Sequence, residues 1–165
     1  RAPHFAGGRL RAQVPGLDRQ WSVSLWFWNG MPPAARGVAG WMVSRDVEDG
    51  QPSAGLHLGI GGTSGSAGRL VLAVGGDDPL HGGKRSVERW TWHHAALVCD
   101  GSLIRAFLDG APELEVWTPR SPLSDHWWFG GRGDGADPWE GRLDEIAVFD
   151  RALSFEEVRA LAARE

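Results

Sequence analysis

Cysteine is almost absent from this 165-residue chain, in which Cys99 is the only one. A single thiol excludes a disulfide framework and a cysteine-rich zinc site. Cys99 ends the apolar run AALVC at 95–99, so we expect it to be buried and unreactive. The chain also lacks an apolar run of the roughly 18 residues that a membrane-spanning helix needs. The sequence therefore argues against membrane insertion.

Basic residues do not gather anywhere along the chain. Its 17 Lys and Arg are outnumbered by 21 Asp and Glu, which gives a formal net charge of −4. A protein that binds nucleic acid or an anionic membrane usually shows a basic stretch or stripe. We therefore do not expect nucleic acid or a membrane surface as a partner.

Glycine, proline and tryptophan are abundant instead. The chain holds 24 Gly, 10 Pro and 10 Trp beside no Tyr, a composition typical of many short strands joined by tight turns. Its length and its 42% of hydrophobic residues suffice for one domain with a sizeable core, so we predict a single domain over residues 1–165. Because the sequence opens on Arg1 rather than Met, we expect a module tethered to other domains of a longer chain.

Alternation of apolar residues marks the strands. In WSVSLWFW at 21–28 the odd-numbered residues share one face, while Trp26 and Trp28 lie on the other. This pattern predicts a central strand that is covered on one side and covered or used on the other. Weak alternation over 5–14 predicts one or two edge strands. About a dozen such segments at even spacing predict an antiparallel sandwich, with 75–85 expected to be a loop.

Residues 140–161, EGRLDEIAVFDRALSFEEVRAL, predict a last strand followed by one short helix. Ser154 and Glu157 have the spacing of a capping box, in which each side chain accepts the backbone N–H of the other residue. Leu153 stands at the offset that packs on Val158 as a hydrophobic staple. We expect the helix to dock on the sandwich through its apolar residues: Phe155, Val158, Leu161 and Ala162.

Four segments in this order resemble the concanavalin A-like lectin/glucanase superfamily, and within it the bacterial laminin G-like modules related to pentraxins. They are WSVSLWFW at 21–28, TWHHAALVCDGS at 91–102, RAFLDG at 105–110, and FGG at 129–131 with WEGRLDEIAVFDRALSFEEV at 139–158. The resemblance implies an all-β, two-sheet antiparallel jelly-roll sandwich with one short C-terminal helix. It also matches three tryptophans to positions where the family has bulky apolar residues, so we interpret them as core: Trp26, Trp92 and Trp139.

Calcium is the cofactor that the resemblance suggests, because such modules often carry an oxygen-ligand calcium site. Asp144, with Asp134 or Asp137 from the preceding loop, could supply hard oxygen ligands. The alternative is that Asp144 and its neighbour Glu145 accept backbone N–H groups or pair with an arginine. Ala6 also stands where relatives often have Asp, which weakens the case for calcium.

Sugar binding is the ligand class that a surplus of tryptophan favours. Trp rings stack on the apolar faces of pyranoses while neighbouring polar side chains fix the hydroxyl groups. Strand context predicts that three further tryptophans are buried: Trp21, Trp41 and Trp127. Four remain as candidate ligand-binding residues: Trp28, Trp90, Trp117 and Trp128. The alternative for each is packing beneath a loop or the helix, so we expect roughly one or two to be exposed.

Catalysis is not favoured, although the superfamily includes glucanases. A retaining glycosidase needs two carboxylates roughly 5 Å apart, usually on one strand face. Asp144 and Glu145 are adjacent and point to opposite faces. Glu113 and Glu115 alternate, but they follow a turn, where we expect a solvated face. With no serine elbow either, we predict no enzyme activity and no catalytic residue.

These features favour a non-catalytic binding or adhesion module, extracellular or displayed at a cell surface, that recognises a glycan or a protein through loops and one sheet face. The alternative is a structural accessory domain that spaces other domains and packs every tryptophan. A glycoside hydrolase is the less favoured third interpretation.

Overall fold

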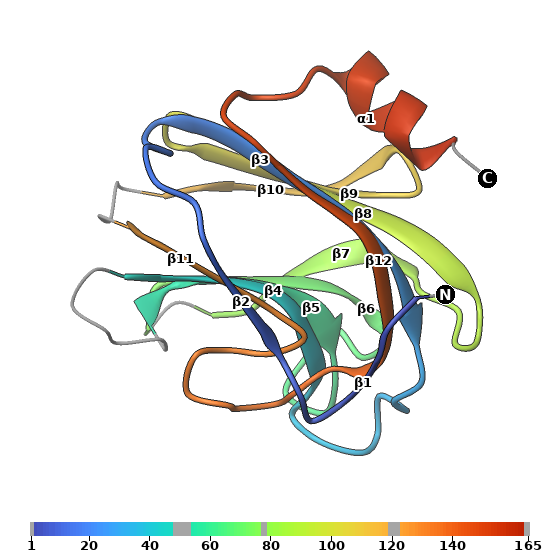
Figure 1. Ribbon diagram of the computed structural model, residues 1–165. Coiled ribbons are helices and arrows are strands. Elements are labelled where there is room, and N and C mark those ends of the chain that lie inside the picture. Colours follow the sequence, from blue (N-terminus) through green and yellow to red (C-terminus); the bar gives the residue numbers. More distant parts are fainter. Residues whose placement is uncertain (1, 48–53, 77–78, 119–122, 164–165) are drawn as a thin grey trace.

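The computed structural model describes residues 2–47, 54–76, 79–118 and 123–163 (Figure 1). Its elements in chain order are β1 (His4–Ala6), β2 (Leu10–Gln13), β3 (Gln20–Asn29), β4 (Val38–Val47), β5 (Leu56–Gly61), β6 (Arg69–Val74), β7 (His81–Ser86), β8 (Trp92–Asp100), β9 (Leu103–Leu108), β10 (Ala111–Trp117), β11 (Leu123–Phe129), β12 (Glu140–Phe149) and α1 (Phe155–Ala162).

The strands form two six-stranded antiparallel sheets that face each other. Sheet A has the order β1-β12-β3-β8-β9-β10, and sheet B has the order β2-β11-β4-β5-β6-β7. The predicted fold class, a two-sheet jelly-roll sandwich with one short C-terminal helix, is confirmed. The segment 5–14 supplies β1 and β2, which lie at sheet edges as predicted.

The expected loop at 75–85 is wrong in part, because β7 begins within it. This strand reads HGGKRS and carries no β-branched or aromatic residue that would predict a strand. Its pairing with β6, in which Leu72 opposes His81, defines it instead. Tertiary pairing has overridden local propensity here.

The core lies between the sheets and follows the alternation of β3. Its odd-numbered residues, from Trp21 to Phe27, are at most 1% exposed. The ring of Trp21 meets that of Trp127 edge-on at 5.2 Å between centroids. Phe27 meets Trp139 in the same way at 5.9 Å. The predicted burial of Trp21, Trp41, Trp127, Trp139 and Cys99 is confirmed.

Helix α1 covers only one end of the outer face of sheet A (Figure 1). The predicted capping box is present, with the N–H of Glu157 donating to Ser154 Oγ and the N–H of Ser154 donating to the Glu157 carboxylate. Leu153 and Val158 are buried against Phe107. Phe155 touches that ring edge-on but stays half exposed, so its predicted burial is wrong in part. In the described part of the chain, no helix is long and apolar enough to cross a membrane.

Glu113 joins the edges of the two sheets and corrects the expectation that it is solvated. It lies on β10, is 2% exposed, and accepts the backbone N–H groups of Lys84 and Arg85 on β7 at 2.7 and 2.9 Å. The Arg85 guanidinium pairs with the same carboxylate. Glu115, two residues on, is exposed as predicted and pairs with Arg105 at 2.8 Å. A single carboxylate thus links β10 of sheet A to β7 of sheet B.

Candidate functional site

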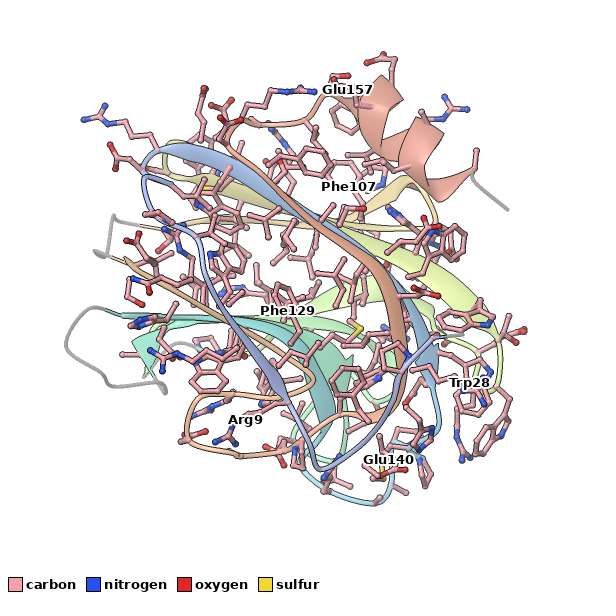
Figure 2. All side chains as sticks on the ribbon, viewed as in Figure 1. Arg9, Trp28, Phe107, Phe129, Glu140 and Glu157 are labelled. Atoms are coloured by element: carbon pink, nitrogen blue, oxygen red, sulfur yellow. The ribbon has the colours of Figure 1, made fainter. Side chains whose placement is uncertain are left out.

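The end of sheet A that α1 leaves uncovered carries four tryptophans. Trp28 of β3 lies directly opposite Trp92 of β8, and both side chains point away from the core. Trp26 follows on the same face of β3. Trp90, in the turn before β8, has its ring centroid 4.9 Å from that of Trp28. These four residues are here termed the tryptophan platform, and Trp28 marks its place in Figure 2.

The platform corrects the interpretation of two tryptophans as core. Trp92 is 39% exposed and Trp26 is half-buried, and both lie on the outer face of sheet A. Alternation along β3 and β8 places them on this face, but it does not say how far α1 reaches over it. Sequence reasoning therefore predicted Trp28 and Trp90 as ligand-binding residues and missed Trp26 and Trp92 beside them.

Trp90 is held in an uncommon backbone conformation. Its φ is +67°, in the left-handed region that a bulky residue rarely adopts. Its N–H donates to Asn29 O at 3.1 Å, and the Arg89 guanidinium lies 4.5 Å from its ring centroid. The side chain is nevertheless 58% exposed, so burial of the ring does not offset the free-energy cost of the strained backbone. Strained backbone conformations cluster at functional sites, so Trp90 is a candidate binding residue.

Charged side chains border the platform. Arg142 of β12 lies opposite Trp28, with its guanidinium 5.8 Å from the ring centroid. Asp144 lies opposite Trp26, is exposed, and accepts the Glu145 N–H at 2.9 Å. A β-bulge follows Asp144, where Glu145 adopts a φ of +47°. Aromatic faces with a guanidinium and a carboxylate at their margin are the groups that contact a sugar ring and its hydroxyls.

Ser24 and His94 lie beside Trp26 on the outer face of sheet A as a hydrogen-bonded pair, with Ser24 Oγ 2.8 Å from His94 Nε2. Both residues are at most 3% exposed, so a substrate does not reach them. Burial lowers the pKa of His94 to about 4, with the carboxylate of Asp109 acting in the opposite direction. His94 Nδ1 has no hydrogen-bond partner among the described residues. Asp109 instead accepts the His94 backbone N–H and contacts the His93 ring at 2.9 Å. The hydrogen bond between Ser24 and His94 therefore stabilises the fold and does not have the arrangement of a catalytic Ser–His–carboxylate triad.

Trp117 and Trp128, the other two predicted ligand-binding residues, lie apart from the platform. Trp117 is on the outer face of sheet A in the row that contains Gln20. That row is eight residues of β3 from Trp28, or roughly 26 Å at about 3.3 Å per residue. Trp117 is 72% exposed. Trp128 lies on sheet B and donates its indole N–H to Asp46 Oδ2 at 2.6 Å.

The three predicted calcium ligands are not brought together. Asp144 lies on the outer face of sheet A, whereas Asp137 accepts the N–H of Trp41 in sheet B through its backbone carbonyl. Asp134 accepts the Ala136 N–H at 3.0 Å and pairs with Arg132. Among the residues that the structure describes, no group of three His, Cys, Asp or Glu side chains is arranged to hold a metal ion. Calcium binding stays a prediction.

An open cavity lies far from the platform, at the opposite end of β3. It has a volume of about 480 Å³ and opens between the sheets beside Trp21, Arg45 and Cys99. Arg45 donates to Ser124 O at 3.0 Å and to Leu17 O at 2.7 Å, and its guanidinium lies close to the rings of Trp21 and Trp127. Two of the three guanidinium nitrogens of Arg45 are thereby engaged in the fold, so we favour the platform, with its exposed rings, as the functional site.

Comparisons with known proteins agree on the fold. A family model described as the concanavalin A-like lectin/glucanases superfamily matches residues 7–159. No curated protein matches the chain at a significant level.

Three solved structures share the architecture at 18% identity. The native heptameric SAP-like pentraxin from Limulus polyphemus has a TM-score of 0.71, with 97% of this chain and 80% of the pentraxin covered. Domain 4 of AbnA, a GH43 extracellular arabinanase from Geobacillus stearothermophilus in complex with arabinotriose, has a TM-score of 0.73 and coverages of 98% and 76%. Trypanosoma rangeli sialidase in complex with the inhibitor DANA also gives 0.73, but only 27% of its chain is covered.

Proposed function

This chain belongs to the concanavalin A-like lectin/glucanases superfamily, and from that premise we propose that it is a non-catalytic carbohydrate-binding module whose ligand stacks on the tryptophan platform. The observation that carries the proposal is Trp90. Its backbone is strained at a φ of +67° while its ring stays 58% exposed against Trp28. A strained backbone that keeps a large aromatic ring exposed to water is explained if that ring contacts a ligand.

The shape of the platform favours a stretch of a linear glycan chain. Arg142, Trp28 and Trp92 lie opposite one another on three neighbouring strands. Strands lie about 4.8 Å apart, so this row spans about 10 Å across the sheet. Such a row can stack successive sugar rings while Arg142 and Asp144 hydrogen-bond their hydroxyl groups.

Two observations support a role without catalysis. The Ser24–His94 pair is buried and lacks a carboxylate on His94 Nδ1 among the described residues. Asp144 is an exposed carboxylate at the platform. The residue after it, Glu145, lies in a β-bulge with a left-handed backbone conformation, so the two acidic residues do not follow regular strand geometry. Neither arrangement presents the matched pair of carboxylates that glycoside hydrolysis requires.

We extend the proposal to an extracellular location as one module of a longer protein. Two structural relatives support this extension. One is a pentraxin, and the other is a single domain of an arabinanase described as extracellular. Arabinan is accordingly the first polysaccharide to test, because that domain was solved with arabinotriose.

Affinity electrophoresis in gels that contain arabinan, xylan or β-glucan tests the proposal. We expect at least one of these neutral polysaccharides to retard the wild-type protein, and Trp90→Gly and Trp92→Ala to migrate as they do without polysaccharide. Trp117→Ala is the matched control, because it removes an exposed ring from a position outside the platform.

Two outcomes would count against this site. If no polysaccharide retards the wild type, the alternative of a structural accessory domain replaces the proposal. If Trp117→Ala loses as much retardation as Trp90→Gly, the ligand binds near β10 instead. Release of reducing sugar from the retarding polysaccharide would overturn the non-catalytic part of the proposal.

A further inference from the structure

The edge of sheet B formed by β2 and β11 carries a second cluster of polar and aromatic groups. Trp128 of β11 lies directly opposite Arg11 of β2, on the sheet face that points away from the core. The guanidinium carbons of Arg9 and Arg11 lie 5.0 and 5.6 Å from the centroid of the Trp128 ring. Figure 2 shows Arg9 on the opposite side of the molecule from Trp28, so this cluster is separate from the tryptophan platform.

The two arginines are not neutralised within the described residues. Neither has a carboxylate within ion-pairing distance in that part of the chain. Arg11 donates through Nη2 to His126 Nε2 at 2.9 Å, and an imidazole ring adds no negative charge. Both side chains are exposed, in a protein whose net charge is −4.

The neighbouring carboxylates have other partners. Asp134 is bound to Arg132, with Nε to Oδ1 at 3.2 Å. Asp46 is buried and accepts the indole N–H of Trp128 at 2.6 Å, so it fixes the ring on which the arginines stack. Burial raises the pKa of the Asp46 carboxyl, while the Trp128 hydrogen bond acts in the opposite direction. A net positive charge therefore remains at this edge.

From this geometry we infer that Arg9 and Arg11, positioned by Trp128, bind the carboxylate of an acidic saccharide of the uronate class. A guanidinium presents a planar fork of N–H donors that matches a carboxylate in a bidentate pair. Two arginines on one ring would otherwise repel each other, and an anion between them relieves this repulsion. A nucleic acid fits less well, because it requires a broader basic surface to neutralise many phosphates.

The inference does not depend on the proposed function, since it uses a different sheet and none of the platform residues. It adds a second glycan contact on the far side of the molecule. With both sites occupied, one copy of the domain would bridge a neutral and an acidic polysaccharide.

Affinity electrophoresis in polygalacturonate at low ionic strength tests the inference. We expect the wild type to be retarded and Arg9→Gln/Arg11→Gln to lose about tenfold or more in apparent affinity, because each lost bidentate pair removes charge-assisted hydrogen bonds. The control is Arg19→Gln/Arg69→Gln, which removes the same charge from two exposed arginines elsewhere. It should stay within about twofold of the wild type, since distant exposed charges are screened. Neutral polysaccharide should bind the Arg9→Gln/Arg11→Gln variant as it binds the wild type.

Three results would overturn the inference. The first is an unretarded wild type. The second is equal loss in the two double variants, which would indicate attraction by overall charge rather than by this cluster. The third is equal retardation by methyl-esterified polygalacturonate or by dextran sulfate, because the site would then not select a carboxylate. Failure of the platform variants in neutral polysaccharide would bear on the proposed function alone.

Discussion

Replacing Glu113 with alanine should destabilise the protein by removing the link between β10 and β7. The side chain of Glu113 is 1% exposed, whereas its partner Arg85 is 46% exposed. Loss of the carboxylate leaves the backbone N–H groups of Lys84 and Arg85 without their acceptor. Glu113→Gln keeps an acceptor oxygen but loses the charge, so it should cost less than Glu113→Ala.

The size of this effect follows from the two groups that lose their partner. An unsatisfied backbone N–H costs about 1–3 kcal/mol, and the lower end applies here because Lys84 and Arg85 lie on an exposed edge strand. The ion pair itself adds under about 1 kcal/mol, since the guanidinium is half in water. A total of about 2–3 kcal/mol lowers the melting temperature of a domain this size by about 4–12 °C. Glu115→Ala, on the exposed side of the same strand, should shift it by less than about 3 °C.

The contribution of Glu113 should also depend on pH in one direction. Burial alone would raise the pKa of its carboxyl, but the hydrogen bonds from Arg85 and Lys84 outweigh burial and lower the pKa below its ordinary value of 4.5. The stabilisation is therefore complete above about pH 4.5 and is lost as the pH falls through the lowered pKa. Thermal melts of wild type and Glu113→Gln should converge in that acidic range. A Glu113→Ala variant that melts with the wild type at neutral pH would refute this reasoning.

Three further changes have defined expected results. Ser154→Ala removes the hydroxyl that caps α1 and should cost about 1 kcal/mol, read as a fall of about 2–4 °C in the melting temperature; no fall would show that the cap does not hold the helix. Glu145→Gly relieves a left-handed residue in the β12 bulge and should leave the melting temperature unchanged or raise it, whereas a clear fall would mean that the Glu145 side chain is needed. If calcium binds, added calcium should raise the melting temperature and EDTA should reverse the rise; a melting temperature that responds to neither removes calcium from the account.

Much of the fold could be predicted because short-range sequence patterns determine its strands and the start of its helix. The alternation over 21–28 correctly divided β3 into a core face and an outer face. The spacing of Ser154 and Glu157 correctly marked the start of α1. Periodicity and capping act over a few residues, so the sequence contains all the information that they need.

The errors concern contacts between distant segments. Glu113 was expected to be solvated because its partner strand, β7, lies 28 residues away and carries a glycine pair that suggested a loop. Trp92 was assigned to the core because the family resemblance matches it to a position with a bulky apolar residue, and that match does not say how much of the outer face of sheet A α1 covers. Residues 77 and 78, which fall within the segment 75–85 that was expected to be a loop, lie outside the described residues.

Only some residues of the candidate site could be predicted from the sequence. Trp28 and Trp90 were predicted as ligand-binding residues, and the structure places them in contact. The left-handed backbone of Trp90 could not be predicted, because that conformation is usually indicated by glycine or asparagine. Arg9 and Arg11 stack on a residue more than a hundred positions later in the chain, so no linear pattern indicates their cluster.

The central claim is that the tryptophan platform binds a glycan, and Trp90→Gly tests it most directly. Glycine relieves the strain at a φ of +67°, which offsets the lost contact with Trp28, so folding stability should stay within about 1 kcal/mol of the wild type. The measurement is a titration of intrinsic tryptophan fluorescence with the neutral polysaccharide that retards the wild type most. We expect a saturable change in the wild type and none in Trp90→Gly at an unchanged melting temperature. A variant that binds with wild-type affinity would contradict the claim.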